Sequence, residues 1–107
     1  ASTGEYEEAI ANFEDAIELC NQTGDIRLQA YALAGAAHVY IMDTERETAR
    51  DYLEEALSIF ASLGERYKIA MVHLDMGRLH LLKKEYNQMR KDLDLSLSIL
   101  EELGLPF

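Results

Sequence analysis

The chain contains little of several residue types, and each shortage excludes a class of protein. It has one cysteine, Cys20, so no disulfide can form within it. It has 10 Lys+Arg against 20 Asp+Glu, a net charge of −10, whereas nucleic acids and anionic membranes need a basic surface. No apolar run in the sequence approaches the roughly 18 residues of a membrane-spanning helix. We therefore expect no nucleic-acid or membrane partner, and we expect a cytoplasmic protein.

The sequence also lacks alternating β-branched runs, so no strand is predicted. Apolar residues instead recur at helical spacing in five segments, joined by short turns that make neighbouring helices antiparallel. The predicted helices cover residues 5–22, 26–42, 45–62, 66–82 and 86–102, after a turn at residues 1–4. The second and fourth are apolar nearly all round, which indicates burial on more than one side.

The turns carry recognisable capping residues. Gly24 can adopt the left-handed conformation that ends a helix, and Asp25 can cap the next one. Thr44 and Glu47 fit a capping box that would open the third helix.

A period of 40 residues relates Gly24, Gly64 and Gly104. A fixed period of this length indicates a stacked repeat array rather than one closed core. We predict a single repeat domain over residues 1–107. Its predicted parts are a half repeat at 4–24, a complete repeat at 25–64, a drifted repeat at 65–104 and a tail at 105–107.

Small residues are expected to let the paired helices approach closely. Ala37 is expected to face Ala49 across one hairpin, and Gly77 is expected to face Met89 across the next.

The complete repeat resembles the tetratricopeptide repeat, whose marks are Leu-Gly, Tyr, Ala, Phe and a second Ala. The corresponding residues here are Ala36-Ala37, Tyr40, Ala49, Leu53 and Ala56. The resemblance covers residues 4–104, with a period of 40 in place of the family's usual 34. It implies an all-α fold, a right-handed α-solenoid of antiparallel helix hairpins with two and a half repeats.

The resemblance further implies a non-catalytic module that binds a peptide or helix of another protein in a concave, largely apolar groove. By that resemblance the first helix of each unit lines the groove, with Tyr31, Ala34, Gly35, His38, Met71, Leu74, Asp75 and Arg78. Three alternatives remain open. The stripe could be buried by adjacent helices, the chain could be the effector- or peptide-sensing segment of a larger bacterial regulator, or it could be a structural self-association module.

No residue pattern indicates catalysis, a cofactor or a metal, so an enzyme is not expected. His73, Met76 and His80 share one helix face, and we interpret them as core residues because no further ligand is fixed by the pattern. Cys20 lies on an apolar stripe and is interpreted as a small buried hydrophobe.

The chain does not begin with Met and starts inside a repeat, so we interpret it as a piece of a longer protein. We expect another chain, such as the second copy of a homodimer, to cover Ile10 and Phe13 at one end and Leu95 at the other. Residues 1–25 hold seven acids and no base. This acidic face is interpreted either as a solvated surface or as a head-to-tail contact with basic residues of a neighbour, namely Lys83, Lys84, Arg90 and Lys91.

Overall fold

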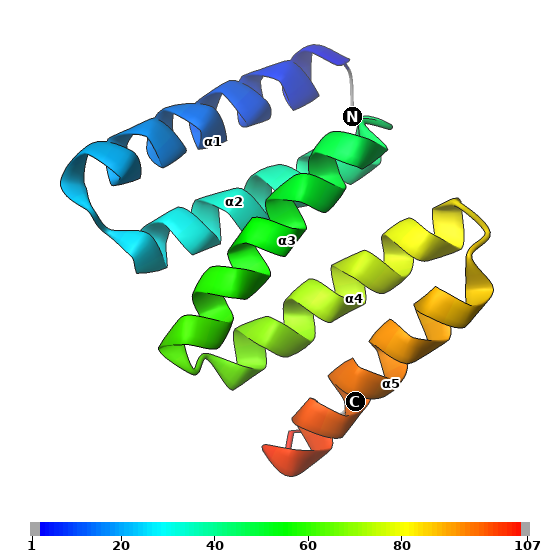
Figure 1. Ribbon diagram of the computed structural model, residues 1–107. Helices are drawn as coiled ribbons and strands as arrows, with labels where there is room; N and C mark the ends of the chain where they lie inside the picture. Colours follow the sequence, from blue (N-terminus) through cyan, green and yellow to red (C-terminus); the bar gives the residue numbers. More distant parts are fainter. Residues whose placement is uncertain (1–2, 106–107) are drawn as a thin grey trace. The chain divides into compact units, whose positions relative to one another are not determined.

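The computed structural model describes residues 3–105 and places five α-helices in them (Figure 1). They are α1 (Thr3–Thr23), α2 (Ile26–Met42), α3 (Arg46–Leu63), α4 (Arg66–Leu82) and α5 (Tyr86–Glu102). No strand occurs in this range. The all-α prediction is confirmed. The limits of α2, α4 and α5 agree with the predicted ones, and those of α1 and α3 differ by one or two residues at each end. The turn expected at residues 1–4 is wrong at Gly4, which lies inside α1, while Ala1 and Ser2 are outside the described residues.

The 40-residue period is visible in the backbone. Gly24, Gly64 and Gly104 have φ of 78°, 68° and 72°, the left-handed conformation predicted for Gly24. Asp25 also caps α2 as predicted, because its Oδ1 accepts a hydrogen bond from the Leu28 N–H at 3.1 Å.

The turns before α3 and α5 are left-handed as well, at two residues that are not glycine. Thr44 has φ 65° and Lys84, 40 positions later, has φ 62°. The capping box predicted at Thr44 is wrong, since α3 begins at Arg46 and the carbonyl of Glu45 accepts the first helical bond, from the Ala49 N–H. Thr44 bends the chain instead of capping the helix.

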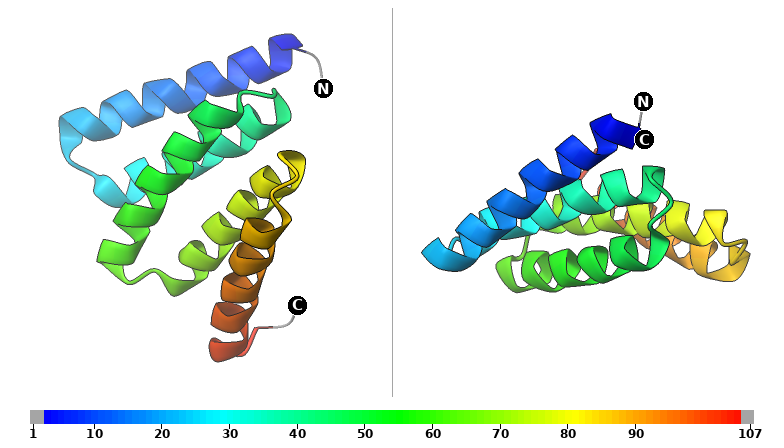
Figure 2. Two further views of the ribbon diagram at one scale, coloured as in Figure 1. Left: turned by 45° about the vertical axis from the view of Figure 1, so that its right-hand side comes forward. Right: turned by 90° about the horizontal axis from the view of Figure 1, so that it is seen from above.

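The chain divides into two compact units, the first ending at Ile59 and the second beginning at Phe60. In the first unit α1 packs on α2, and in the second α4 packs on α5; the helices of each pair lie side by side in the views of Figure 2. The predicted repeat limits at residues 24/25 and 64/65 stay a prediction from the sequence.

Small residues fill the closest helix contacts in both units. Ala37 and Ala49 are fully buried, and Gly35 lies against the ring of Phe13 on α1. In the second unit, the nearest atoms to a Cβ built on Gly77 are those of Leu93 and Asp92. Met89, which was expected to face Gly77, lines the same surface hollow as Gly77. Leu93 lies one turn further along α5 than Met89, and its branched side chain occupies the space that the missing Cβ leaves.

A buried polar bond also joins α4 to α5. Ser96 is fully buried, and its Oγ donates a hydrogen bond to the backbone carbonyl of Ala70 at 2.9 Å. Cys20 is buried at 2% exposure, as expected of a small apolar side chain.

Candidate protein-binding site

A hollow of about 280 Å³ opens on the surface where α4 and α5 meet, and we refer to it as the α4–α5 hollow. Its lining residues are Leu74, Gly77, Arg78 and Leu81 from α4 and Met89 and Leu93 from α5. The lining is apolar except for Arg78, whose side chain is exposed. Such a hollow can receive an apolar side chain and place a cation beside it.

The hollow contains two of the four α4 residues predicted to line a binding groove. Leu74 is half-buried and Arg78 is exposed, and both line the hollow. Met71 and Asp75, also half-buried, are not among its lining residues. The helical spacing of Leu74, Arg78 and Leu81 explains why three residues of one stripe reach the same hollow.

The α2 residues predicted for the groove divide into two kinds. Tyr31, at 39% exposure, and His38 are exposed, whereas Ala34 and Gly35 are half-buried. A Cβ on Gly35 would lie 2.5 Å from Cε1 of Phe13, so this side of α2 faces α1.

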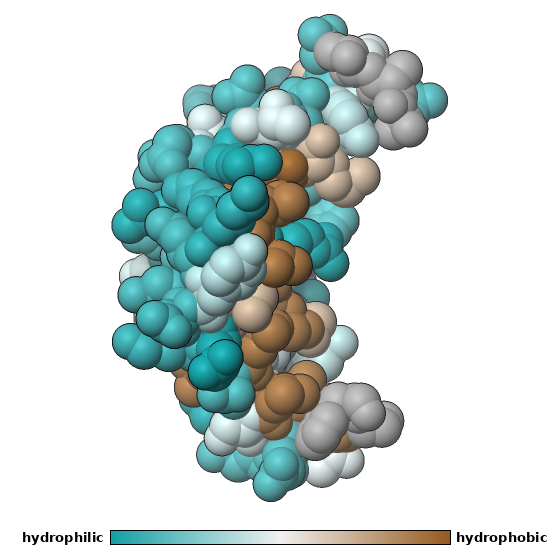
Figure 3. Space-filling view, turned by 90° about the vertical axis from the view of Figure 1, so that its right-hand side faces the viewer, coloured by the Kyte–Doolittle hydropathy of each residue, from teal (hydrophilic) through white to brown (hydrophobic). Residues whose placement is uncertain are grey.

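The residues predicted for self-association also differ in exposure. Leu95 is 45% exposed on α5, while Ile10 and Phe13 are half-buried. Part of the ring surface of Phe13 is therefore already covered by Gly35 inside the first unit. Exposed apolar side chains beside hydrophilic ones are visible in Figure 3.

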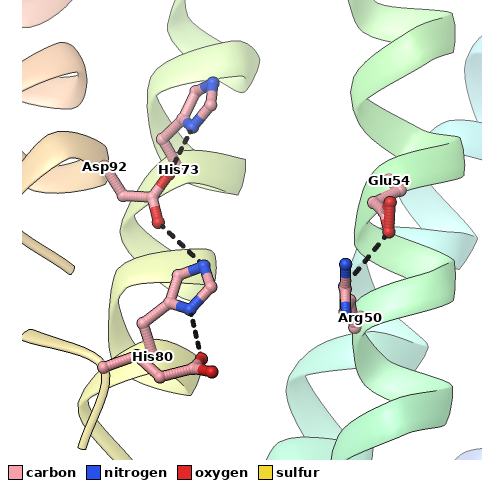
Figure 4. A network of polar contacts seen from close by, with 6 residues as sticks. Arg50, Glu54, His73, His80 and Asp92 are labelled. Carbon is pink, nitrogen blue, oxygen red and sulfur yellow. Dashed lines mark hydrogen bonds and ion pairs between the residues drawn. The ribbon is translucent and has the colours of Figure 1, made fainter. Parts of the chain in front are cut away.

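A cluster of polar side chains joins α4 to α5 in the second unit (Figure 4). His73 Nδ1 lies 3.1 Å from Asp92 Oδ1, and His80 Nε2 lies 3.4 Å from Asp92 Oδ2. His80 Nδ1 lies 2.8 Å from Glu85 Oε1. A neutral imidazole has one N–H, so only the charged form of His80 can donate to both carboxylates. Figure 4 also draws the exposed pair of Arg50 and Glu54 on α3, four residues apart.

Asp92 lies between the two histidines of this cluster, and neither it nor Glu85 was predicted from the sequence. Asp92 is 15% exposed, and its buried Oδ2 makes no hydrogen bond among the described residues; His80 Nε2 lies 3.4 Å from it. The signal available in the sequence was that Asp92 directly precedes Leu93, an apolar residue of α5 that packs on α4. The histidines were interpreted as core, yet they are partly exposed and bind a carboxylate. No group of three or more His, Cys, Asp or Glu side chains within residues 3–105 is arranged to hold a metal ion.

A larger open hollow, of about 440 Å³, lies along Lys84, Glu85, Tyr86, Asn87 and Gln88 at the start of α5. Its walls come from five consecutive residues. It therefore brings together no side chains from separate elements, and the α4–α5 hollow remains the stronger candidate.

The profile of the tetratricopeptide repeat matches residues 1–62, more than half of the chain. The chain belongs to the tetratricopeptide repeat family. Neither the curated proteins nor the solved structures contain a significant match to it. Tetratricopeptide repeats generally mediate protein–protein interactions by binding proteins or peptides, and they are typically non-catalytic. No helix in the described part of the chain is long and apolar enough to cross a membrane.

The family's Tyr position has a partner in this tetratricopeptide repeat that the sequence did not predict. Tyr40 packs edge-on against Tyr52, with ring centroids 5.4 Å apart. Both hydroxyls donate to Glu14 of α1, Tyr52 at 2.6 Å and Tyr40 at 3.4 Å. Burial raises the pKa of Tyr52 above its usual value, and the hydrogen bond to Glu14 and its negative charge raise it further. Burial and Glu14 raise the pKa of Tyr40 in the same way. The cluster ties α1, α2 and α3 together within the first unit.

Proposed function

We propose that the chain is a non-catalytic module that binds a peptide or helix of a partner protein, and that the α4–α5 hollow is a main point of contact. The observation that carries the proposal is that Leu74 and Arg78, predicted for binding from the sequence, line one apolar hollow. The family's general role in protein interaction supports the same reading.

The chemistry of the hollow defines the partner segment. An apolar side chain would displace water from Leu74, Leu81 and Leu93, which is favourable at roughly 25 cal/mol per Å² of apolar surface buried. A carboxylate beside it would meet Arg78, whose planar guanidinium forms paired hydrogen bonds with carboxylates. Helical segments that carry an apolar residue one turn from an acid fit these requirements.

The helical frame lowers the cost of binding. Leu74 and Arg78 belong to one helix, and Met89 and Leu93 to another that packs on it, so few backbone torsions need ordering when a segment binds. The exposed side chains of Tyr31 and His38 on α2 offer a further surface in the first unit. The eight-residue groove predicted from the sequence stays a prediction.

A panel of helical 15-residue peptides that vary in apolar and acidic content tests the proposal, with binding followed by fluorescence polarisation. Leu74→Glu should lower the affinity for the peptides that bind by at least about tenfold, because it places a carboxylate in an apolar hollow that acidic groups of the partner approach. Leu95→Glu is the matched control, since Leu95 is exposed on α5 but does not line the hollow. Equal effects of the two variants, with circular dichroism showing both folded, would refute the proposal.

A further inference from the structure

One exposed stripe of α1 combines acids with a leucine. Glu8, Asn12, Asp15 and Leu19 follow one another at spacings of four, three and four, and all four are exposed. Leu19 is 57% exposed, the highest value among the large apolar side chains of the described residues. Asp15 lies one helical turn before it. This is the combination of apolar and acidic groups that the α4–α5 hollow fits.

The charge around the hollow is opposite to that of α1. Residues 74–93, from the first to the last lining residue, hold five bases and three acids, whereas residues 1–25 hold seven acids and no base. Arg78 lines the hollow itself, and Arg90 directly follows its lining residue Met89. Opposite charges on two surfaces accelerate their encounter and select the partner.

We propose that the hollow of one copy receives Leu19 of a second copy, with Asp15 of that second copy pairing with Arg78. The inference rests on the proposed function, because it names the occupant of the same surface. Asp15 and Leu19 are four residues apart, a rise of about 6 Å along α1. This separation allows Leu19 to contact Leu74 and Leu93 in the hollow while Asp15 pairs with the neighbouring Arg78.

The two surfaces lie on different parts of the chain, so the contact is head-to-tail. One such contact leaves an α1 and a hollow of the pair unoccupied, and each can take part in a second contact of the same kind. The expected association therefore strengthens with concentration and depends on Leu19, Asp15 and Arg78. A dimer through Ile10, Phe13 and Leu95, as expected from the sequence, would not depend on these three residues.

Sedimentation equilibrium of the 107-residue chain measures the association. The weight-average mass should rise with concentration above the 12.1 kDa of one chain, and it should fall at high salt because exposed charges are screened. Leu19→Ser, Asp15→Lys and Arg78→Glu should each weaken association about tenfold or more. Glu55→Lys, an exposed residue of α3, is the control for the charge change of Asp15→Lys and should have no such effect.

Mixing variants provides the decisive comparison. Asp15→Lys and Arg78→Glu should each remain monomeric alone but associate when mixed, because Asp15 of the second variant can still pair with Arg78 of the first. The double variant should recover association through the reversed pair. A wild-type chain that stays monomeric at the highest concentration would overturn the inference, as would association that Leu19→Ser and both charge reversals leave unchanged. If the chain is monomeric but peptides bind in a manner sensitive to Leu74→Glu, the proposed function stands and the second copy as occupant falls.

Discussion

Two helical glycines offer a test of the packing in each unit. Replacing Gly35 by Ala would put its Cβ 2.5 Å from Cε1 and 2.7 Å from Cζ of Phe13, so the ring must move. Replacing Gly77 by Ala would put its Cβ 3.2 Å from Cδ2 of Leu93, a contact that a methyl group can relieve by shifting a few tenths of an ångström. The same substitution thus meets a rigid ring in one unit and a flexible side chain in the other.

The expected magnitudes follow from two opposing effects. Ala in place of Gly within a helix stabilises it by about 1 kcal/mol. Overpacking costs about 1–3 kcal/mol where the neighbour cannot adapt. Gly35→Ala should therefore lower the free energy of unfolding by about 1 kcal/mol, while Gly77→Ala should raise it by about 0.5 kcal/mol.

Urea unfolding followed by circular dichroism at 222 nm measures both variants, with an unchanged dependence on urea as the sign that the unfolded states are comparable. Phe13→Leu should relieve the clash, so its combination with Gly35→Ala should lose less stability than the sum of the two single changes. The reasoning would be refuted if Gly35→Ala stabilised the protein as much as Gly77→Ala and showed no coupling to Phe13.

Three further outcomes are expected. Thr44→Gly should raise the free energy of unfolding by about 0.5–1 kcal/mol, because glycine adopts φ 65° without the strain of a β-branched residue, and a lower urea midpoint would contradict this. Raising the pH above about 10, the usual tyrosine pKa, should destabilise the wild type more steeply than the Tyr52→Phe variant. The raised pKa of Tyr52 keeps the proton on its hydroxyl in the folded state, while the unfolded chain releases that proton. Stability that is present below about pH 10 is therefore lost as the pH rises. Parallel pH profiles of thermal midpoints would exclude this role for the bond to Glu14. Ser96→Ala should change the free energy of unfolding by less than about 1 kcal/mol, since the lost hydrogen bond is offset by better helix propensity. Ser96→Val should lower it by about 1–3 kcal/mol through overpacking, and chemical denaturation of the two variants measures the difference.

The sequence predicted the features that depend on local chemistry. Glycine tolerates positive φ and aspartate accepts from a helix N-terminus, so Gly24 and Asp25 could be assigned without tertiary information. Thr44 could not, because its pattern satisfies the local rule for a cap while the connection to α3 requires a left-handed residue there.

Contacts between helices were harder to predict. The expected pairing across the hairpin places Met89 opposite Gly77, whereas the atoms nearest to Gly77 belong to Leu93, one turn further along α5. The role of Asp92 depends on two histidines of another helix, and neither spacing nor composition specifies that meeting. Leu74 and Arg78 were predicted for a binding groove by helical spacing together with the family resemblance. The hollow that joins them to α5 required the structure.

The buried hydroxyl of Ser96 has a consequence for how α5 can slide along α4. Only one register places its Oγ 2.9 Å from the carbonyl of Ala70, and any displacement by a turn would leave a buried hydroxyl without a partner, at about 1–3 kcal/mol. The equivalent position 40 residues earlier is Ala56, which is also fully buried but has no hydrogen bond to lose. The α4–α5 pair therefore carries a penalty against misaligned packing, and it is this pair that forms the walls of the α4–α5 hollow.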